Sequence, residues 1–80
     1  MPFGVYNSSD NVALAKYAPT DMDNNNDDKY YGFLDSSGNW YILHETTSAG
    51  TNRYTKGSSD YSTAWTNRAT QIYVYFDQIF

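Results

Sequence analysis

The sequence contains no cysteine, one histidine and few basic residues. A disulfide framework and a thiolate zinc site are therefore excluded, and one histidine cannot form a two-histidine metal site. Five Lys and Arg residues against nine Asp and Glu residues give a formal net charge of -4, which provides no basic footprint for the phosphates of a nucleic acid. We expect a chain that holds no cofactor and binds no nucleic acid.

Long hydrophobic runs are also absent. No segment approaches the roughly 18 consecutive apolar residues of a membrane-spanning helix. Residues 1–6 lack the basic region and the apolar run of a secretory signal. We therefore expect synthesis and folding in the cytoplasm, without contact with a membrane.

Aromatic side chains, by contrast, are abundant. Nine Tyr, four Phe and two Trp residues make up 19% of a chain of 80 residues. A domain of this length buries only roughly 60–65% of the surface that its unfolded chain exposes, so its core is too small for all of these rings. We expect a single domain over residues 1–80 that gains stability by associating with further copies, since disulfides and metals are excluded.

Alternating β-favouring residues predict a mainly β fold. The segments 30–34 and 40–45 flank turn formers at residues 35–39 and predict a β-hairpin. Residues 53–56 and 70–76 predict two further strands, because apolar and polar residues alternate through the latter. The expected architecture is a small antiparallel β-sandwich or open barrel of about five strands with one short helix.

The remaining segments are shorter or more polar. Residues 12–17 favour a fifth short strand over a helical turn, because the segment is brief and Pro19 follows it closely. Residues 61–69 place apolar and aromatic residues at helical spacing and predict the helix. Residues 1–11 are expected to form an N-terminal arm and residues 18–29 an acidic loop. The expected core consists of Leu14, Phe33, Ile42, Trp65, Ile72, Val74 and Phe76.

Oxygen-bearing residues alternate through the expected acidic loop as they do in a calcium loop: Asp21, Asp23, Asn25 and Asp27. The EF-hand pattern then fails, because Asn26 and Gly32 stand where that loop has a glycine and a bidentate glutamate. A solvated loop is favoured over a calcium or magnesium site.

His44 and its neighbour Glu45 are not part of a recognisable catalytic pattern. No serine lies in a G-x-S-x-G elbow. Glu45 is the one glutamate, and it has no evident partner carboxylate for glycoside cleavage. We expect a protein that is not an enzyme.

The surplus aromatic residues have three competing explanations: partial burial with the hydroxyl in water, a subunit interface, or a platform that stacks on sugars. The interface explanation also accounts for apolar residues near both termini, and it predicts contacts by Phe3, Val5, Tyr6, Tyr73, Tyr75, Ile79 and Phe80. The carbohydrate-binding alternative uses Trp40, Tyr41 and Tyr54, with Tyr73 and Tyr75 as further stacking residues.

Residues 30–42 match the pattern Y-x-G-x-x-D-x-x-G-x-W-Y-I, and residues 65–69 match W-x-N-R-A. With the segment 54–61 between them, these motifs resemble small proteins encoded by tailed bacteriophages, over residues 30–76. The resemblance implies a virion structural protein, either a capsid decoration or a tail-associated subunit, that is made in the host cytoplasm and binds other virion proteins. It implies no catalytic residue. A glycan-binding module is the alternative, and a small inhibitor of a host protein is a third explanation.

Overall fold

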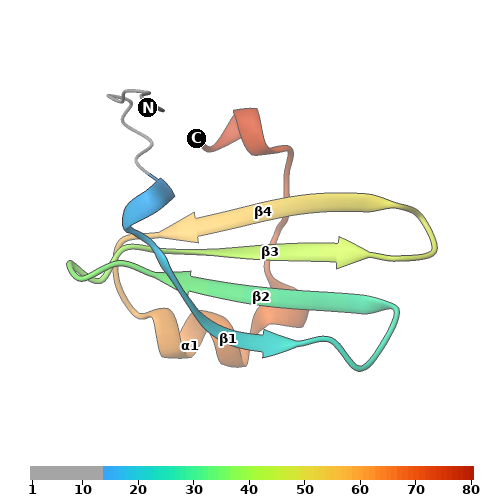
Figure 1. Cartoon of the computed structure of the whole chain (residues 1–80), viewed down its shortest axis with the longest axis horizontal. Helices are drawn as coiled ribbons and strands as arrows, with labels where there is room; N and C mark the ends of the chain where they lie inside the picture. The colour runs from blue at the N-terminus through green and yellow to red at the C-terminus, as the bar shows by residue number, and fades with distance from the viewer. Residues whose placement is uncertain (1–13) are drawn as a thin grey trace.

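The computed structural model describes residues 14–80, and the expected arm at residues 1–11 lies outside this range. The described residues form one open antiparallel sheet whose four strands follow each other across it in sequence order (Figure 1). The strands are β1 (Ala18–Asp23), β2 (Asp28–Leu34), β3 (Trp40–Thr46) and β4 (Thr51–Gly57). One helix, α1 (Tyr61–Thr66), and three 3-10 turns, η1 (Leu14–Lys16), η2 (Arg68–Thr70) and η3 (Phe76–Gln78), complete the chain.

The predicted hairpin is confirmed, and its turn is held by one carboxylate. Asp35 Oδ1 accepts hydrogen bonds from the backbone N–H groups of Ser37 and Asn39, each at 2.9 Å, and Oδ2 accepts a third from the Asn39 side chain. Gly38 takes a φ of 91°, which a residue with a side chain rarely adopts. The register then places Leu34 opposite Trp40 and Tyr30 opposite His44.

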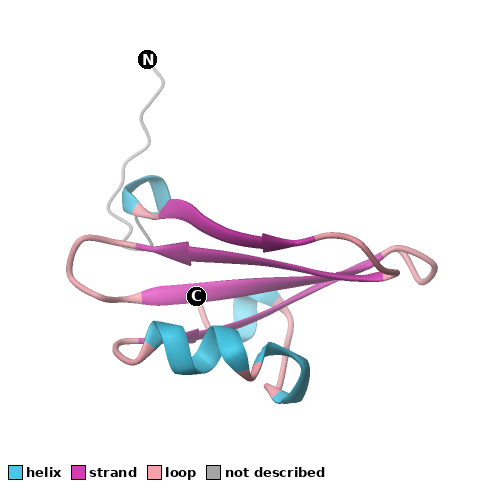
Figure 2. Ribbon diagram, turned by 90° about the horizontal axis from the view of Figure 1, so that it is seen from below, coloured by secondary structure: helices cyan, strands magenta, loops and turns pink. Residues whose placement is uncertain are grey.

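One face of the sheet, called the helix face here, carries Tyr30, Gly32, Leu34, Trp40, Ile42 and His44, which are paired across β2 and β3. Helix α1 lies under this face (Figure 2). Ile42 is fully buried and forms the core with Trp40 and Ala64. Other apolar residues on this side, including Tyr61 and Trp65, are only partly buried around that core.

Two glycines make the close packing of the helix face possible. A Cβ atom at Gly32 would overlap the Tyr61 hydroxyl and approach Trp65 Cε3 to 3.0 Å, so α1 can approach β2 only at a residue without a side chain. A Cβ atom at Gly57 would overlap the indole of Trp40, whose Nε1 donates a hydrogen bond to the Ser59 carbonyl at 2.6 Å. The core is therefore small, and its packing requires side chains to lie directly against the backbone at Gly32 and Gly57.

The C-terminal segment passes from one face of the sheet to the other around the outer edge of β4. Tyr73 packs on the helix face beside Tyr30 and His44. Val74 then exchanges two backbone hydrogen bonds with Tyr54 in β4, at 2.7 and 2.9 Å. Beyond it, Phe76 contacts Tyr54 on the opposite face. Figure 1 shows η3 beyond the β4 edge.

The mainly β expectation is confirmed, but the described residues contain one open sheet of four strands and neither a sandwich nor a barrel of five. The expected strand at residues 70–76 is reduced to the single bridge at Val74 between η2 and η3. Residues 14–16 of the expected strand at 12–17 form a 3-10 turn. Ile72, expected in the core, is 82% exposed, because only one residue of this segment pairs with β4 and the chain turns away on both sides.

The expected acidic loop over residues 18–29 is wrong at both ends. Its first six residues form β1, and Asp28 begins β2, so only residues 24–27 connect the two strands. β1 contains a bulge between Pro19 and Asp21, which moves Thr20 out of register with β2. A polar sequence forms a strand here because two of its carboxylates bond to residues of α1 and η2.

Candidate binding surface

The face of the sheet opposite α1, called the open face here, carries a second set of aromatic residues. The register places Phe33 opposite Tyr41 and Tyr31 opposite Leu43, with Tyr54 opposite Leu43 from β4. The rings of Phe33 and Tyr41 stack with centroids 4.5 Å apart. All five side chains are only partly buried. Within residues 14–80, no second layer of secondary structure covers the whole of this apolar face.

The β3–β4 half of the open face is covered by the chain's own C-terminal segment. The Phe80 ring meets Tyr41 edge-on at 5.3 Å, and the Phe76 ring meets Tyr54 at 5.2 Å. Phe76 and Phe80 also stack on each other at 4.7 Å. The ammonium group of Lys56 lies 5.1 Å from the Phe80 ring centroid. This half of the face therefore already has an aromatic cover.

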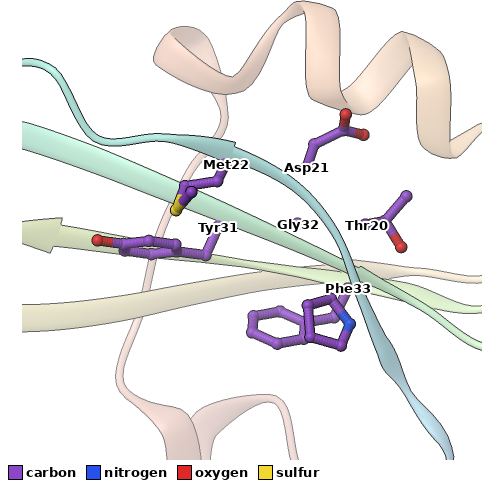
Figure 3. Close-up of a pocket in the computed structure, with 7 residues that line it drawn as sticks. Thr20, Asp21, Met22, Tyr31, Gly32 and Phe33 are labelled. Atoms are coloured by element: carbon purple, nitrogen blue, oxygen red, sulfur yellow. The ribbon is translucent and has the colours of Figure 1, made fainter.

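The β1–β2 half of the open face is left with a pocket of about 490 Å³, lined by Pro19, Thr20, Asp21, Met22, Tyr31, Gly32 and Phe33. Figure 3 shows the side chains of Met22, Tyr31 and Phe33 on one side of the sheet and Asp21 on the other. Met22 is 65% exposed. The walls are thus mainly apolar, and an aliphatic or aromatic side chain is the chemical group that fits them.

Each carboxylate in and beside the β1–β2 connection has a protein partner. Asp21 Oδ2 accepts a hydrogen bond from the Tyr61 hydroxyl at 2.8 Å. Burial, followed by this bond, raises the pKa of Tyr61. Asp27 accepts hydrogen bonds from both the backbone and the hydroxyl of Ser48. Within the part of the chain that the structure describes, no three His, Cys, Asp or Glu residues are grouped as metal ligands.

Asp23 forms the most connected ion pair of the sheet. Its Oδ2 accepts hydrogen bonds from Arg68 Nε and Nη2 at 3.1 and 3.0 Å. The same guanidinium lies 4.5 Å from the Trp65 ring centroid, and its Nη1 donates to the Trp65 carbonyl. Arg68 therefore ties β1 to the end of α1, which is the long-range contact that holds a polar edge strand in place.

His44 lies on the helix face, and its contacts within residues 14–80 do not have the geometry of a catalytic triad. Its Nε2 is 3.0 Å from Asp28 Oδ1 and 3.4 Å from Thr46 Oγ1. In a triad, the carboxylate and the nucleophile contact different nitrogens of the imidazole, whereas here both contact the same one. The bond to His44 is the main cause that holds the pKa of Asp28 below its ordinary value. The ring stacks on Tyr30 at 4.7 Å.

The seven expected interface residues fall into different environments. Phe3, Val5 and Tyr6 lie outside the described residues. Tyr73 is half-buried on the helix face and donates a hydrogen bond from its hydroxyl to the Arg68 carbonyl at 2.8 Å. Burial raises the pKa of Tyr73. Tyr75 is 58% exposed, with the Arg53 guanidinium 4.1 Å from its ring centroid. Ile79 and Phe80 are partly buried near the open face.

The expected glycan-stacking residues do not form one platform. Trp40 is 6% exposed and packs on the helix face, so its rings offer no free surface to a sugar. Tyr41 and Tyr54 lie on the open face under Phe80 and Phe76. Two of the residues that line an accessible pocket, Met22 and Tyr31, were not predicted as site residues, and two others, Asp21 and Phe33, were considered only as a calcium ligand and a core residue. The one available signal was that Met22 is the only apolar residue in an otherwise polar segment.

Comparisons with known proteins give no further guide. No protein-family model matches the chain, and neither a curated protein nor a solved structure matches it. No helix among residues 14–80 is long and apolar enough to cross a membrane.

Proposed function

We propose that this chain is a non-enzymatic structural protein that acts by assembling with other protein subunits, as a capsid decoration or tail-associated subunit of a virion. The proposal rests on the contrast between the few apolar residues that are buried and the many aromatic side chains that stay partly exposed. The apolar residues that are fully or nearly buried within residues 14–80 are Trp40, Ile42 and Ala64, while the open face presents a layer of partly exposed aromatic residues. Such a layer is typical of surfaces that other protein chains cover.

The virion assignment is supported by the resemblance of residues 30–42 and 65–69 to tailed-bacteriophage proteins. In such an assembly, a neighbouring subunit covers the sheet in place of the second layer of the β-sandwich that the sequence predicts. The glycan-binding alternative is less favoured, because the burial of Trp40 leaves Tyr41 and Tyr54 as its only members on the open face.

Two measurements test the proposal. Sedimentation velocity of the full chain over a wide concentration range is expected to show self-association, and mass spectrometry of purified particles is expected to detect the chain in the virion. A monomer at all concentrations that also melts above about 70 °C, beyond the usual mesophilic range, and that is absent from particles would contradict it.

A further inference from the structure

We infer that the pocket between β1 and β2 binds Phe3 from the N-terminal segment of a neighbouring copy of this chain. This inference rests on the proposed function and specifies which surfaces meet when subunits assemble. The N-terminal segment and the pocket lie on different parts of the chain, so each subunit can insert its segment into one neighbour and bind the segment of another neighbour in its pocket. Such a head-to-tail contact builds rings or extended arrays.

The chemistry of the pocket favours an apolar occupant. Its walls come from Pro19, Met22, Tyr31 and Phe33, and the one carboxylate in the lining, on Asp21, is turned to the other side of the sheet and bonded to Tyr61 (Figure 3). A charged occupant would therefore meet no compensating charge in the pocket, whereas an aromatic ring would replace water on apolar walls.

The half of the open face that is already covered shows how this chain packs rings on the sheet. There the chain uses Phe76 and Phe80, two rings from one short segment, against Tyr41 and Tyr54. The pocket presents the same kind of surface one strand further along the sheet, since Phe33 stacks on Tyr41. An occupant with closely spaced apolar and aromatic residues would extend the same mode of packing.

The chain that precedes the described residues has a suitable composition and length. Residues 1–6 contain Phe3, Val5 and Tyr6 and no charged side chain. Phe3 lies eleven residues before Leu14, the first described residue, and eleven residues can span at most about 40 Å when extended. The longest dimension of the molecule is 37 Å, so this length allows Phe3 to contact the pocket of an adjacent subunit.

A disulfide-trapping experiment tests the contact, and the cysteine-free sequence makes it clean. The full-length double variant Pro2→Cys/Thr20→Cys keeps Phe3 and Met22, places one thiol beside the inserted ring and the other in the pocket lining, and is oxidised and analysed on a non-reducing gel. We expect a ladder of linked subunits. The matched control is Pro2→Cys/Ile72→Cys, which carries the same number of thiols, one of them at a residue that is 82% exposed and outside the pocket lining. A ladder no stronger than that of the control overturns the inference, and so does a disulfide formed only within one chain.

A complementation experiment measures the energetics. Phe3→Ala removes the inserted ring and Met22→Lys places a charge in the pocket, so each variant alone is expected to associate roughly 10- to 100-fold more weakly than the wild type. The equimolar mixture still contains one intact segment and one intact pocket, and it should form heterodimers but no longer species. Circular dichroism checks that both variants fold, and Met22→Ser replaces Met22→Lys if the latter does not.

The outcomes separate this inference from the proposed function. If the wild type associates and both variants associate as strongly as the wild type, the inference is wrong and assembly uses another surface. If the wild type shows no association at any concentration, self-assembly fails and the inference fails with it.

Discussion

The substitution Gly32→Ala tests the close approach between β2 and α1. A methyl group at this position would occupy the space of the Tyr61 hydroxyl and press on Trp65. The Tyr61 ring cannot withdraw without breaking its 2.8 Å hydrogen bond to Asp21, and that bond links α1 to β1. The substitution therefore acts on three elements at once.

The expected loss of unfolding free energy in Gly32→Ala is the sum of two unfavourable contributions and one favourable contribution. Overpacking a close contact costs about 1–3 kcal/mol, and loss of the hydrogen bond to Asp21 adds about 1–2 kcal/mol at this partly exposed site. Replacing glycine by alanine within a strand returns roughly 0.5–1 kcal/mol through lower chain entropy. The net loss is about 1–4.5 kcal/mol, which is a substantial part of the roughly 4–12 kcal/mol expected for a chain of this length.

Urea unfolding followed by tryptophan fluorescence is the assay, because Trp65 lies at this contact and packs against the core that contains Trp40. The control is the same substitution in a Tyr61→Ala background, where the overlap with the Tyr61 hydroxyl is gone and only the 3.0 Å approach to Trp65 Cε3 remains, so Gly32→Ala should cost less than about 1 kcal/mol. Equal losses in the two backgrounds would refute the steric argument, as would a Gly32→Ala variant with the stability of the wild type.

Three further predictions concern the core, the carboxylates and the C-terminal cover. Ile42→Ala should lose about 2–5 kcal/mol of unfolding free energy, whereas the exposed Ile72→Ala should stay within about 0.5 kcal/mol of the wild type by urea titration. The pKa values of Asp28 and Asp35 are lowered on folding, so the stabilisation by these carboxylates is fully present above the ordinary aspartate pKa of about 3.9 and is lost as the pH falls through the lower folded values. In a series from pH 6 to pH 2, the urea midpoint should therefore decrease once the pH is below about 4, and it should decrease less steeply in Asp28→Asn. A midpoint that does not change with pH would contradict this. Phe80→Ala should lose roughly 1–2 kcal/mol because the ring covers Tyr41, and unchanged thermal unfolding would show that this cover is not stabilising.

The hairpin could be predicted because its signals are local. The residues that pair in β2 and β3 are β-favouring, and the turn between them is stabilised by Asp35, which bonds to residues two and four positions away. The helix could be predicted for the same reason, since its apolar spacing is contained in one short segment. Such signals need no knowledge of the rest of the chain.

The strand β1 could not be predicted, because what stabilises it lies far away in the sequence. Asp21 bonds to Tyr61 and Asp23 to Arg68, across separations of 40 and 45 residues. Read alone, these aspartates indicate a solvated loop. The pocket could not be predicted for the same reason, since Met22 lines it only after β1 has paired with β2.

The C-terminal alternation led to the opposite error. Alternation predicts that Ile72, Val74 and Phe76 share one buried side. Instead, Ile72 is 82% exposed, Val74 pairs with the edge of β4, and Phe76 contacts Tyr54 on the open face. A period of two over seven residues is thus too short a signal to establish a strand, because it does not show that the backbone finds a strand to pair with along its length.

The passage of the C-terminal segment around β4 also sets an order of events during biosynthesis. Residues 74–80 are translated after all four strands, so a nascent chain holds β4 with a bare outer edge until Val74 emerges and binds Tyr54. A bare edge recruits strands from other chains. Translation pauses or premature stop codons before Val74 should therefore yield insoluble fragments, even though every strand of the sheet has already been made.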